Sequence, residues 1–290
     1  KSCCNDGTGY TPCLDVDACA AGGPAVGQYA FVLSYVNVPS KERFLPYVES
    51  MRAAGALGAP NRFDILLIMP EADARRLSPG QREYLSASGV KLVEVAWMLP
   101  PGMRFWREKG WCGPKDLVRL HALGFEGYDA VAYFDSDMEF WGDPSPVFRC
   151  AASGRLLTTA GLDGIPLNIG FFAVRPDKRL LRAAEIFGRE AEYNDSFGWA
   201  GSGFAPAVNK KYRTAECGQG FMHTLFYKRG SSMALQVLEE VGLGEAGFIG
   251  EQVDTCVWNY QGDFCGESFD CSQVRVHHKP SPDATAHDPR

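Results

Sequence analysis

The stretch Val131-Ala132-Tyr133-Phe134-Asp135-Ser136-Asp137-Met138-Glu139-Phe140-Trp141 decides the fold of this chain. It opens with apolar, β-branched and aromatic residues, which predict a buried strand. The strand ends in Asp135 and Asp137, which are two residues apart and therefore project to the same side of an extended chain. Two such carboxylates can hold a divalent cation that keeps coordination positions open for phosphate oxygens. The alternative is a strand end with two solvated acids, since Asp is common at turns.

Strand-like and helix-like segments alternate before this stretch. Apolar runs that predict buried strands span residues 29–36, 63–69 and 90–95. Segments with helical signals follow these strands in turn, at 39–55, from Ser78-Pro79 onward and at 115–123. This rhythm predicts the α/β class, with a Rossmann-like, mostly parallel sheet flanked by helices. Ligands of open α/β sheets bind beyond the carboxyl ends of the strands, which is where Asp135 and Asp137 fall.

The chain after the stretch continues the same pattern. Residues 143–146 predict a turn, 156–159 and 167–174 predict strands, and 177–189 predict an amphipathic helix. Residues 193–213 lack a regular pattern, and that length indicates a candidate substrate loop. A further helix is expected to open at Gly218.

Composition and charge exclude several classes of protein. The 290 residues carry 29 basic and 35 acidic side chains, a net charge of -6, and no basic stripe, so nucleic acid is not expected as a partner. No apolar run approaches the length of a membrane-spanning helix, so no span is expected in this chain. The chain begins at Lys1 without an initiator Met, and a signal or anchor that preceded this point would not be visible.

The 10 cysteines cluster at the two ends of the chain, and none forms a CxxC pair, which argues against zinc. An even number without metal spacing favours disulfides, and hence the lumen of the secretory pathway (Golgi or ER) or secretion. The N-glycosylation pattern Asn194-Asp195-Ser196 agrees with this compartment. We expect disulfide-bonded terminal extensions, with a Cys-rich extension at 1–27, a single domain at 28–280 and a tail at 281–290.

The ordered motifs resemble the glycogenin-like family of retaining glycosyltransferases, which have the GT-A fold. The resemblance covers about residues 29 to 280 and rests on five features in the family's order. These are Ser34-Tyr35 after the first strand, the helix from Lys115 to Leu120, Phe134-Asp135-Ser136-Asp137, the strand Leu167-Asn168-Ile169-Gly170-Phe171-Phe172, and Gly218-Gln219-Gly220 followed by a late His with Lys279-Pro280. Each feature is common by itself, and their order carries the resemblance.

The resemblance implies a UDP-linked sugar as donor, a glycan, glycoprotein or glycolipid as acceptor, and a divalent cation, usually Mn²⁺ with Mg²⁺ as an alternative. A cation that bridges two phosphates stabilises the negative charge of the departing nucleoside diphosphate without a proton transfer. Asp135 and Asp137 would be two of its ligands, and either His277 or His278 would be the third. His277 fits the family's spacing to Lys279 better.

The resemblance also implies a set of residues that contact the donor. They are Ser34, Tyr35, Asn37, Lys115, Asp135, Ser136, Asp137, Asn168, Gly170 and Lys279. Some have structural alternatives, since Tyr35 either stacks on the uracil or packs in the core. In the same way, Lys115 is either a donor contact or an ordinary exposed lysine, and Asn168 either binds sugar hydroxyls or shapes a turn.

The candidate catalytic residues are Gln219 and Glu216. Gln219 falls where the family places a glutamine near the reacting sugar carbon. The acid that usually precedes this glutamine is replaced here by Gly218, and the nearby Glu216 is a candidate substitute. A double displacement needs a carboxylate nucleophile, so without one a same-face substitution assisted by the leaving diphosphate is favoured.

These motifs predict a Mn-dependent, retaining glycosyltransferase of hexosyl or pentosyl type. The alternative is a donor-hydrolysing or non-catalytic sugar-nucleotide-binding protein of the same fold. A phosphodiesterase is a further rival, but 5 histidines are a poor supply of metal ligands. Four tryptophans either form an acceptor platform by stacking on sugar faces or pack internally, namely Trp106, Trp111, Trp199 and Trp258.

Overall fold

The computed structural model of the chain describes residues 4–5, 10–35, 40–96, 116–161, 165–210, 212, 214–227, 231–244, 250–261 and 270–278. The predicted donor contacts Asn37, Lys115 and Lys279 lie outside these residues, as do Trp106 and Trp111. Their roles therefore stay predictions from the sequence.

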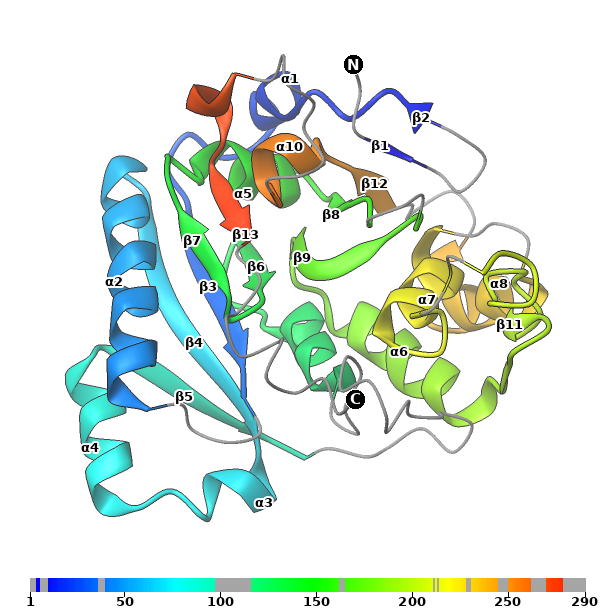
Figure 1. Cartoon of the computed structure of the whole chain (residues 1–290), viewed down its shortest axis with the longest axis horizontal. Helices are drawn as coiled ribbons and strands as arrows, with labels where there is room; N and C mark the ends of the chain where they lie inside the picture. Colours follow the sequence, from blue (N-terminus) through cyan, green and yellow to red (C-terminus); the bar gives the residue numbers. More distant parts are fainter. Residues whose placement is uncertain are drawn as a thin grey trace.

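A seven-stranded sheet forms the centre of the described part of the chain (Figure 1). Its order is β12-β8-β9-β6-β3-β4-β5. The strands are β3 (Gln28–Ser34), β4 (Arg62–Pro70), β5 (Val90–Val95), β6 (Ala130–Phe134), β8 (Leu156–Thr159), β9 (Asn168–Val174) and β12 (Gly250–Gln252). β9 runs antiparallel to β6 and β8, and the other neighbours are parallel. This confirms the predicted α/β class with a mostly parallel sheet.

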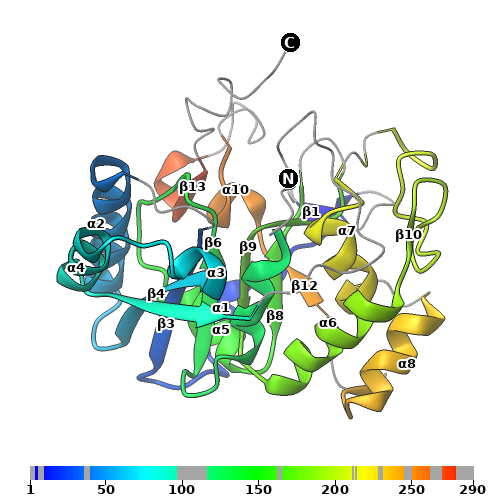
Figure 2. The ribbon, with the colours of Figure 1, turned by 90° about the horizontal axis from the view of Figure 1, so that it is seen from below.

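Helices cover both faces of the sheet, as Figures 1 and 2 show. One face packs against α1 (Val16–Ala20), α2 (Lys41–Leu57), α3 (Glu71–Ala74), α4 (Pro79–Ala87) and α5 (Ser145–Ala152). The other face packs against the 3-10 helix η1 (Asp116–Gly124), α6 (Lys178–Glu190), α7 (Gly218–Met222), the π-helical turn η3 (His223–Tyr227) and α8 (Ser232–Glu240). In Figure 1, α2 and α4 lie to the left of the strands and α6, α7 and α8 to the right.

The side chains of β3 show how the sheet is held between these two layers. Tyr29, Phe31 and Leu33 belong to the core on the α2 side, and Ala30 and Val32 to the core on the η1 side. All five are fully buried, as expected for a strand covered on both faces by helices. Because β3 pairs in parallel with β6, their carboxyl ends meet at the same edge of the sheet.

Local hydrogen bonds explain where two helices begin. The Ser78 hydroxyl accepts from the Gln81 N–H, and the Gln81 side chain accepts from the Ser78 N–H, so α4 begins at Pro79 as predicted. The turn predicted at 143–146 is wrong in its second half. The Asp143 carboxylate accepts from the Ser145 N–H at 2.8 Å, and the helix α5 begins at Ser145.

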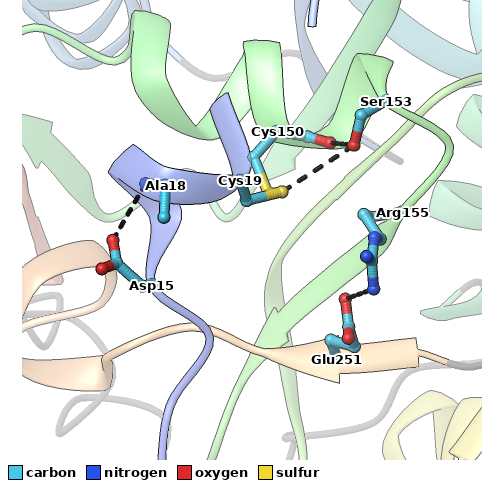
Figure 3. The surroundings of a disulfide bond; sticks show 7 residues. All are labelled: Asp15, Ala18, Cys19, Cys150, Ser153, Arg155 and Glu251. Atoms are coloured by element: carbon cyan, nitrogen blue, oxygen red, sulfur yellow. Dashed lines mark hydrogen bonds and ion pairs between the residues drawn. A yellow bond between two sulfur atoms is a disulfide. The ribbon is translucent and has the colours of Figure 1, made fainter. Parts of the chain in front are cut away.

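The N-terminal extension is tied to the sheet domain. A disulfide joins Cys19 of α1 to Cys150 of α5, and the Ser153 hydroxyl lies beside it (Figure 3). Near this bond, Arg155, which directly precedes β8, pairs with Glu251 of β12 at 2.6 Å. Cys13, Cys217 and Cys256 are also disulfide-bonded. The expected disulfide bonding of the N-terminal extension is therefore confirmed.

A second, two-stranded sheet carries the end of the described chain back to the DxD segment. β7 (Met138–Phe140) pairs antiparallel with β13 (Val276–His278), with His277 opposite Glu139 and His278 opposite Met138. The predicted irregular segment 193–213 contains a short hairpin of β10 (Tyr193–Asn194) and β11 (Gly198–Trp199). Among the described residues, no helix combines the length and the apolar character needed to cross a membrane.

Candidate metal and donor site

Three possible metal ligands meet at the carboxyl end of β6. Asp135 follows β6 directly, Asp137 precedes β7, and the pairing of β7 with β13 brings in His278. One ligand atom from each of the three lies within 4.8 Å of the others, and the His278 Nε2 is 3.2 Å from the Asp137 Oδ1. Two carboxylates and one imidazole fit a divalent cation of the first transition series. The two aspartates are thus brought together, but by a turn at residues 136–137 and not by an extended strand as their spacing had suggested.

The other nitrogen of His278 has its own partners. Its Nδ1 lies 2.8 Å from the Asn259 Oδ1 and 3.0 Å from the Gln261 Nε2. Asn259 is fully buried, and its Nδ2 donates to the Thr159 hydroxyl at 2.9 Å. With Nδ1 donating to the Asn259 oxygen, the lone pair of Nε2 points toward the aspartates, as a metal-binding imidazole requires.

The electrostatics of His278 favour a positive charge at this place. Burial alone would lower its pKa, but the hydrogen bond to Asp137 and the charges of Asp137 and Asp135 raise that pKa above its ordinary value. A proton and a divalent cation would therefore compete for the same nitrogen.

His277 is placed differently from its neighbour. Its ring packs against Trp141, with 4.4 Å between centroids, and against Tyr260, with 5.6 Å. Successive residues of a strand project to opposite sides, so the pairing that brings His278 to the aspartates turns His277 away from them. The structure therefore corrects the preference for His277: it brings His278, and not His277, into the three-residue group.

The carboxylate, the N–H and the carbonyl of Asp135 all form hydrogen bonds. Its Oδ1 accepts from the Arg119 Nη1 at 2.9 Å and from the Tyr133 hydroxyl at 3.0 Å. Its N–H donates to the Gly170 carbonyl at 2.8 Å, and its carbonyl accepts from the Tyr47 hydroxyl at 2.6 Å. Burial raises the pKa of Asp135, and Asp137 adds to this, whereas Arg119 opposes it. A cation beside Asp135 would relieve this unfavourable charge.

Arg119 is a site residue that the sequence reasoning missed. Its side chain is only 14% exposed, pairs with the Asp116 Oδ1 at 2.6 Å and lies over the Tyr133 ring at 4.8 Å. Burial alone would lower the pKa of Arg119, but Asp116 and Asp135 raise it. The sequence held a signal for Arg119, because this cation lies among the leucines of the helix that begins near Lys115.

The predicted donor contacts around β3 and β9 surround the same strand end. The Ser34 hydroxyl lies 3.0 Å from the Tyr133 hydroxyl. The half-buried Tyr35 forms a side-chain hydrogen bond with the exposed Ser136. Burial raises the pKa of Tyr35 to about 12. The Asn168 Oδ1 accepts from the Gly170 N–H at 2.7 Å. These positions agree with a donor site, and the contacts with a donor stay predictions.

Gly170 permits the close approach of β9 to Asp135. A Cβ at residue 170 would lie 2.6 Å from the Asp135 Oδ2 and 2.8 Å from the Asn168 Oδ1. Real Cβ atoms essentially never come so near, so any side chain here would displace the carboxylate. The glycine therefore belongs to the geometry of the site.

The two predicted catalytic residues differ in exposure. Gln219 is half-buried, and its Oε1 accepts from the Thr214 hydroxyl at 2.7 Å. Glu216 is 2% exposed in the turn before α7, so its carboxylate does not face solvent. The roles of both residues stay predictions, and the burial of Glu216 speaks against it as a nucleophile.

The structure decides between the two interpretations for two of the four tryptophans. Trp199 is fully buried and Trp258 is 4% exposed, so neither can offer its face to an acceptor. Both pack in the core, which was the alternative interpretation. Trp141, next to His277, is 48% exposed.

Comparisons with known proteins find similar chains among solved structures but none by sequence. No protein-family model matches the sequence, and a search of curated proteins finds no match. The galactosyltransferase LgtC with donor and acceptor sugar analogs shares 10% identity over 88% of this chain and 87% of that chain, with a TM-score of 0.45. GlyE of Streptococcus pneumoniae shares 13% over 89% and 55%, with a TM-score of 0.44. The bifunctional WbbM shares 9% over 93% and 47%, with a TM-score of 0.46.

These three structures are all of glycosyltransferases, the class that the sequence resemblance names, and none is a glycogenin. At such low identities and TM-scores, the likeness carries no argument about the chemistry of this chain. The chemistry rests on the side chains at the end of β6.

Proposed function

We propose that this chain transfers a sugar from a UDP-linked donor to a carbohydrate or glycoconjugate acceptor, with Mn²⁺ or Mg²⁺ as cofactor. The observation that supports it is the meeting of Asp135, Asp137 and His278 at the carboxyl end of a central strand of an α/β sheet. Their side chains are 32%, 29% and 15% exposed, so the group is held in the fold and still open to a ligand.

The residues of the chain divide the work as follows. Asp135, Asp137 and His278 would hold the cation, which supplies positive charge to the diphosphate as it leaves. Asn259 orients His278, and Arg119 with Tyr133 holds one oxygen of Asp135. A mixed set of oxygen and nitrogen ligands suits Mn²⁺ better than Mg²⁺, which prefers oxygen.

The stereochemical outcome that we propose is retention. Gln219 is half-buried at the start of α7, and the one acid of the preceding turn, Glu216, is buried. A covalent intermediate needs a carboxylate on the donor face. The sugar is therefore proposed to move by same-face substitution, in which the leaving diphosphate assists the acceptor.

A panel of UDP-sugars with Mn²⁺, read by UDP release, tests this function. Wild type is expected to release UDP, and Asp137→Ala is expected to release it at least about 10²-fold more slowly, since a metal ligand is lost. Asp129→Asn is the matched control. Asp129 directly precedes β6, at the end of that strand away from the metal site, and it accepts from the Gln28 N–H. Wild type that neither binds nor turns over any UDP-sugar would sink the proposal. Release that needs no acceptor would point to a donor hydrolase.

We also propose that the chain works in the lumen of the secretory pathway (Golgi or ER) or outside the cell. The Cys19–Cys150 disulfide supports this, since disulfides persist in oxidising compartments. Asn194 of the sequence Asn194-Asp195-Ser196 is exposed at the β10–β11 hairpin and so is accessible to glycosylation. Protein made in a eukaryotic secretory host should lose mass on treatment with an N-glycosidase, and Asn194→Gln should not. Free thiols at Cys19 and Cys150 in that protein would contradict the compartment.

A further inference from the structure

The first residue of α7 has no room for a side chain. A Cβ placed on Gly218 would lie 2.7 Å from the Asp116 Oδ2 and 3.2 Å from the Leu117 Cδ2, and it would also meet the Ile169 Cδ1. All three neighbours are side-chain atoms, and only Asp116 is charged. The space that a side chain at residue 218 would fill is thus occupied by the Cδ1 methyl of Ile169, which is nearest, and by the carboxylate of Asp116.

Both oxygens of this carboxylate are used. The Asp116 Oδ2 accepts from the Gly218 N–H at 2.9 Å, and the Oδ1 accepts from the Arg119 Nη2 at 2.6 Å. The Asp116 side chain is only 8% exposed. A carboxylate this buried is unusual, because Asp is almost never fully buried unless it is paired.

The same arginine continues the chain of contacts to the metal site. The Arg119 Nη1 donates to the Asp135 Oδ1 at 2.9 Å and to the Ile169 carbonyl at 3.2 Å. Four groups are therefore connected in order: the N–H of Gly218, Asp116, Arg119 and Asp135. This path joins the start of α7, where Gln219 lies, to the carboxyl end of β6.

We propose that Asp116 is a positioning residue that sets the place of Gln219 relative to Asp135 through the N–H of Gly218 and the guanidinium of Arg119. This inference rests on the proposed function. Asp116 acts through two neighbours: it fixes the peptide of Gly218 by its N–H, and it holds half of the Arg119 guanidinium. Since Arg119 is shared, its hold on Asp135 stays limited, and the Asp135 Oδ2 remains for a cation.

Loss of Asp116 is expected to act on both ends of the path. Arg119 would turn its full charge toward Asp135 and compete with a cation, so Mn²⁺ should bind more weakly. The Gly218 N–H would lose its acceptor, so Gln219 should shift, and a shift of about 1 Å can cost about 10²-fold in rate. The KM for the donor should change less than kcat, because the residues predicted to contact the donor are unchanged.

The test relocates the carboxylate from residue 116 to residue 218. Four proteins are compared with wild type: Asp116→Ala, Asp116→Asn, Gly218→Asp, and the double variant Asp116→Ala with Gly218→Asp. Each single change should lower kcat and weaken Mn²⁺ binding, the last one by crowding two acids together. The double variant should recover at least about tenfold of the rate lost in Asp116→Ala, since its new carboxylate fills the space left by the old one. If the double variant folds poorly, adding Ile169→Val removes the closer of the two methyl contacts that remain, and the Leu117 Cδ2 at 3.2 Å is left in place.

Three readouts separate this proposal from the proposed function. They are the Tm of the metal-free protein, the Kd of Mn²⁺ by electron paramagnetic resonance without nucleotide, and kcat and KM with the active UDP-sugar. A double variant no better than Asp116→Ala in all three would overturn the positioning role, as would an Asp116→Ala protein with wild-type Mn²⁺ binding and kcat. If wild type binds Mn²⁺ but turns over no UDP-sugar, the proposed function falls, and the Mn²⁺ and Tm series still tests whether Asp116 acts through Arg119 on the metal site.

Discussion

Two aspartates on this sheet have the same kinds of partners and opposite electrostatics. Asp64 on β4 accepts from the Lys91 Nζ at 2.5 Å and from the Tyr128 hydroxyl at 2.7 Å. Asp135 accepts from the Arg119 Nη1 at 2.9 Å and from the Tyr133 hydroxyl at 3.0 Å. The two side chains are similarly exposed, at 28% and 32%.

Their pKa values nevertheless move in opposite directions. At Asp64 the cost of burial is outweighed by Lys91 and Tyr128, and the pKa falls below its ordinary value. At Asp135 burial raises the pKa, and other acids add to it, while Arg119 is divided between Asp135 and Asp116. Where one cation pairs with one acid, the two charges balance. Where further acids surround the pair, the local net charge stays negative. The second arrangement is the one that suits a divalent cation.

The largest expected effect comes from removing the negative charge of Asp135. Asp135→Asn should reduce Mn²⁺-dependent UDP release at least about 10²-fold, because the cation loses an anionic ligand. Asp64→Asn should leave kcat within about twofold, since surface substitutions away from the site have small effects. Initial rates at saturating donor and Mn²⁺ check both. Equal losses in the two variants would mean that the difference between the two aspartates has no bearing on catalysis.

The adjacent histidines of β13 give the next effect. His278→Ala should weaken Mn²⁺ binding by more than about tenfold. Loss of a residue that only supports a metal ligand already costs about tenfold in affinity, and loss of a ligand itself should cost more. His277→Ala should leave the Kd of Mn²⁺ unchanged and lower Tm, because His277 packs on Trp141 and Tyr260. The Kd is measured by titration of the metal-free protein. A larger loss of Mn²⁺ affinity in His277→Ala than in His278→Ala would restore the preference drawn from spacing.

Much of this site could be predicted from local pattern, and the rest depends on contacts between distant segments. The strands at 90–95 and 156–159 match their predictions, and the DxD pair falls just after a strand as predicted, because apolar runs are local properties of the sequence. The choice between His277 and His278 depends on the register of β13 against β7, which no local pattern specifies. Arg119 stands out in the sequence as the only Lys or Arg of η1, but its contact with Asp135 is visible only in the structure.

A smaller effect concerns the space beside Asp135. Gly170→Ala should lower kcat about tenfold, since the new methyl would push the carboxylate away from its place and small misplacements are costly. Gly80→Ala in α4 is the matched control, because a Cβ there meets nothing within 4 Å. Both variants should fold, which far-ultraviolet circular dichroism and Tm will show. A fully active Gly170→Ala would show that the Asp135 carboxylate can move without loss.

The smallest effect returns to Asp64 and concerns stability alone. A carboxyl whose pKa is depressed in the folded state contributes stability that is present above its unfolded pKa, about 3.9, and is lost as pH falls through the folded value. Because Lys91 is 59% exposed, solvent screens the pair, and the contribution should be below about 1 kcal/mol. Urea unfolding should therefore show Asp64→Asn slightly less stable than wild type at neutral pH, with the gap closing below about pH 3.9. A gap that persists unchanged in acid would mean that Asp64 stabilises the fold through hydrogen bonds that do not need its charge, and the contrast with Asp135 would then be one of geometry.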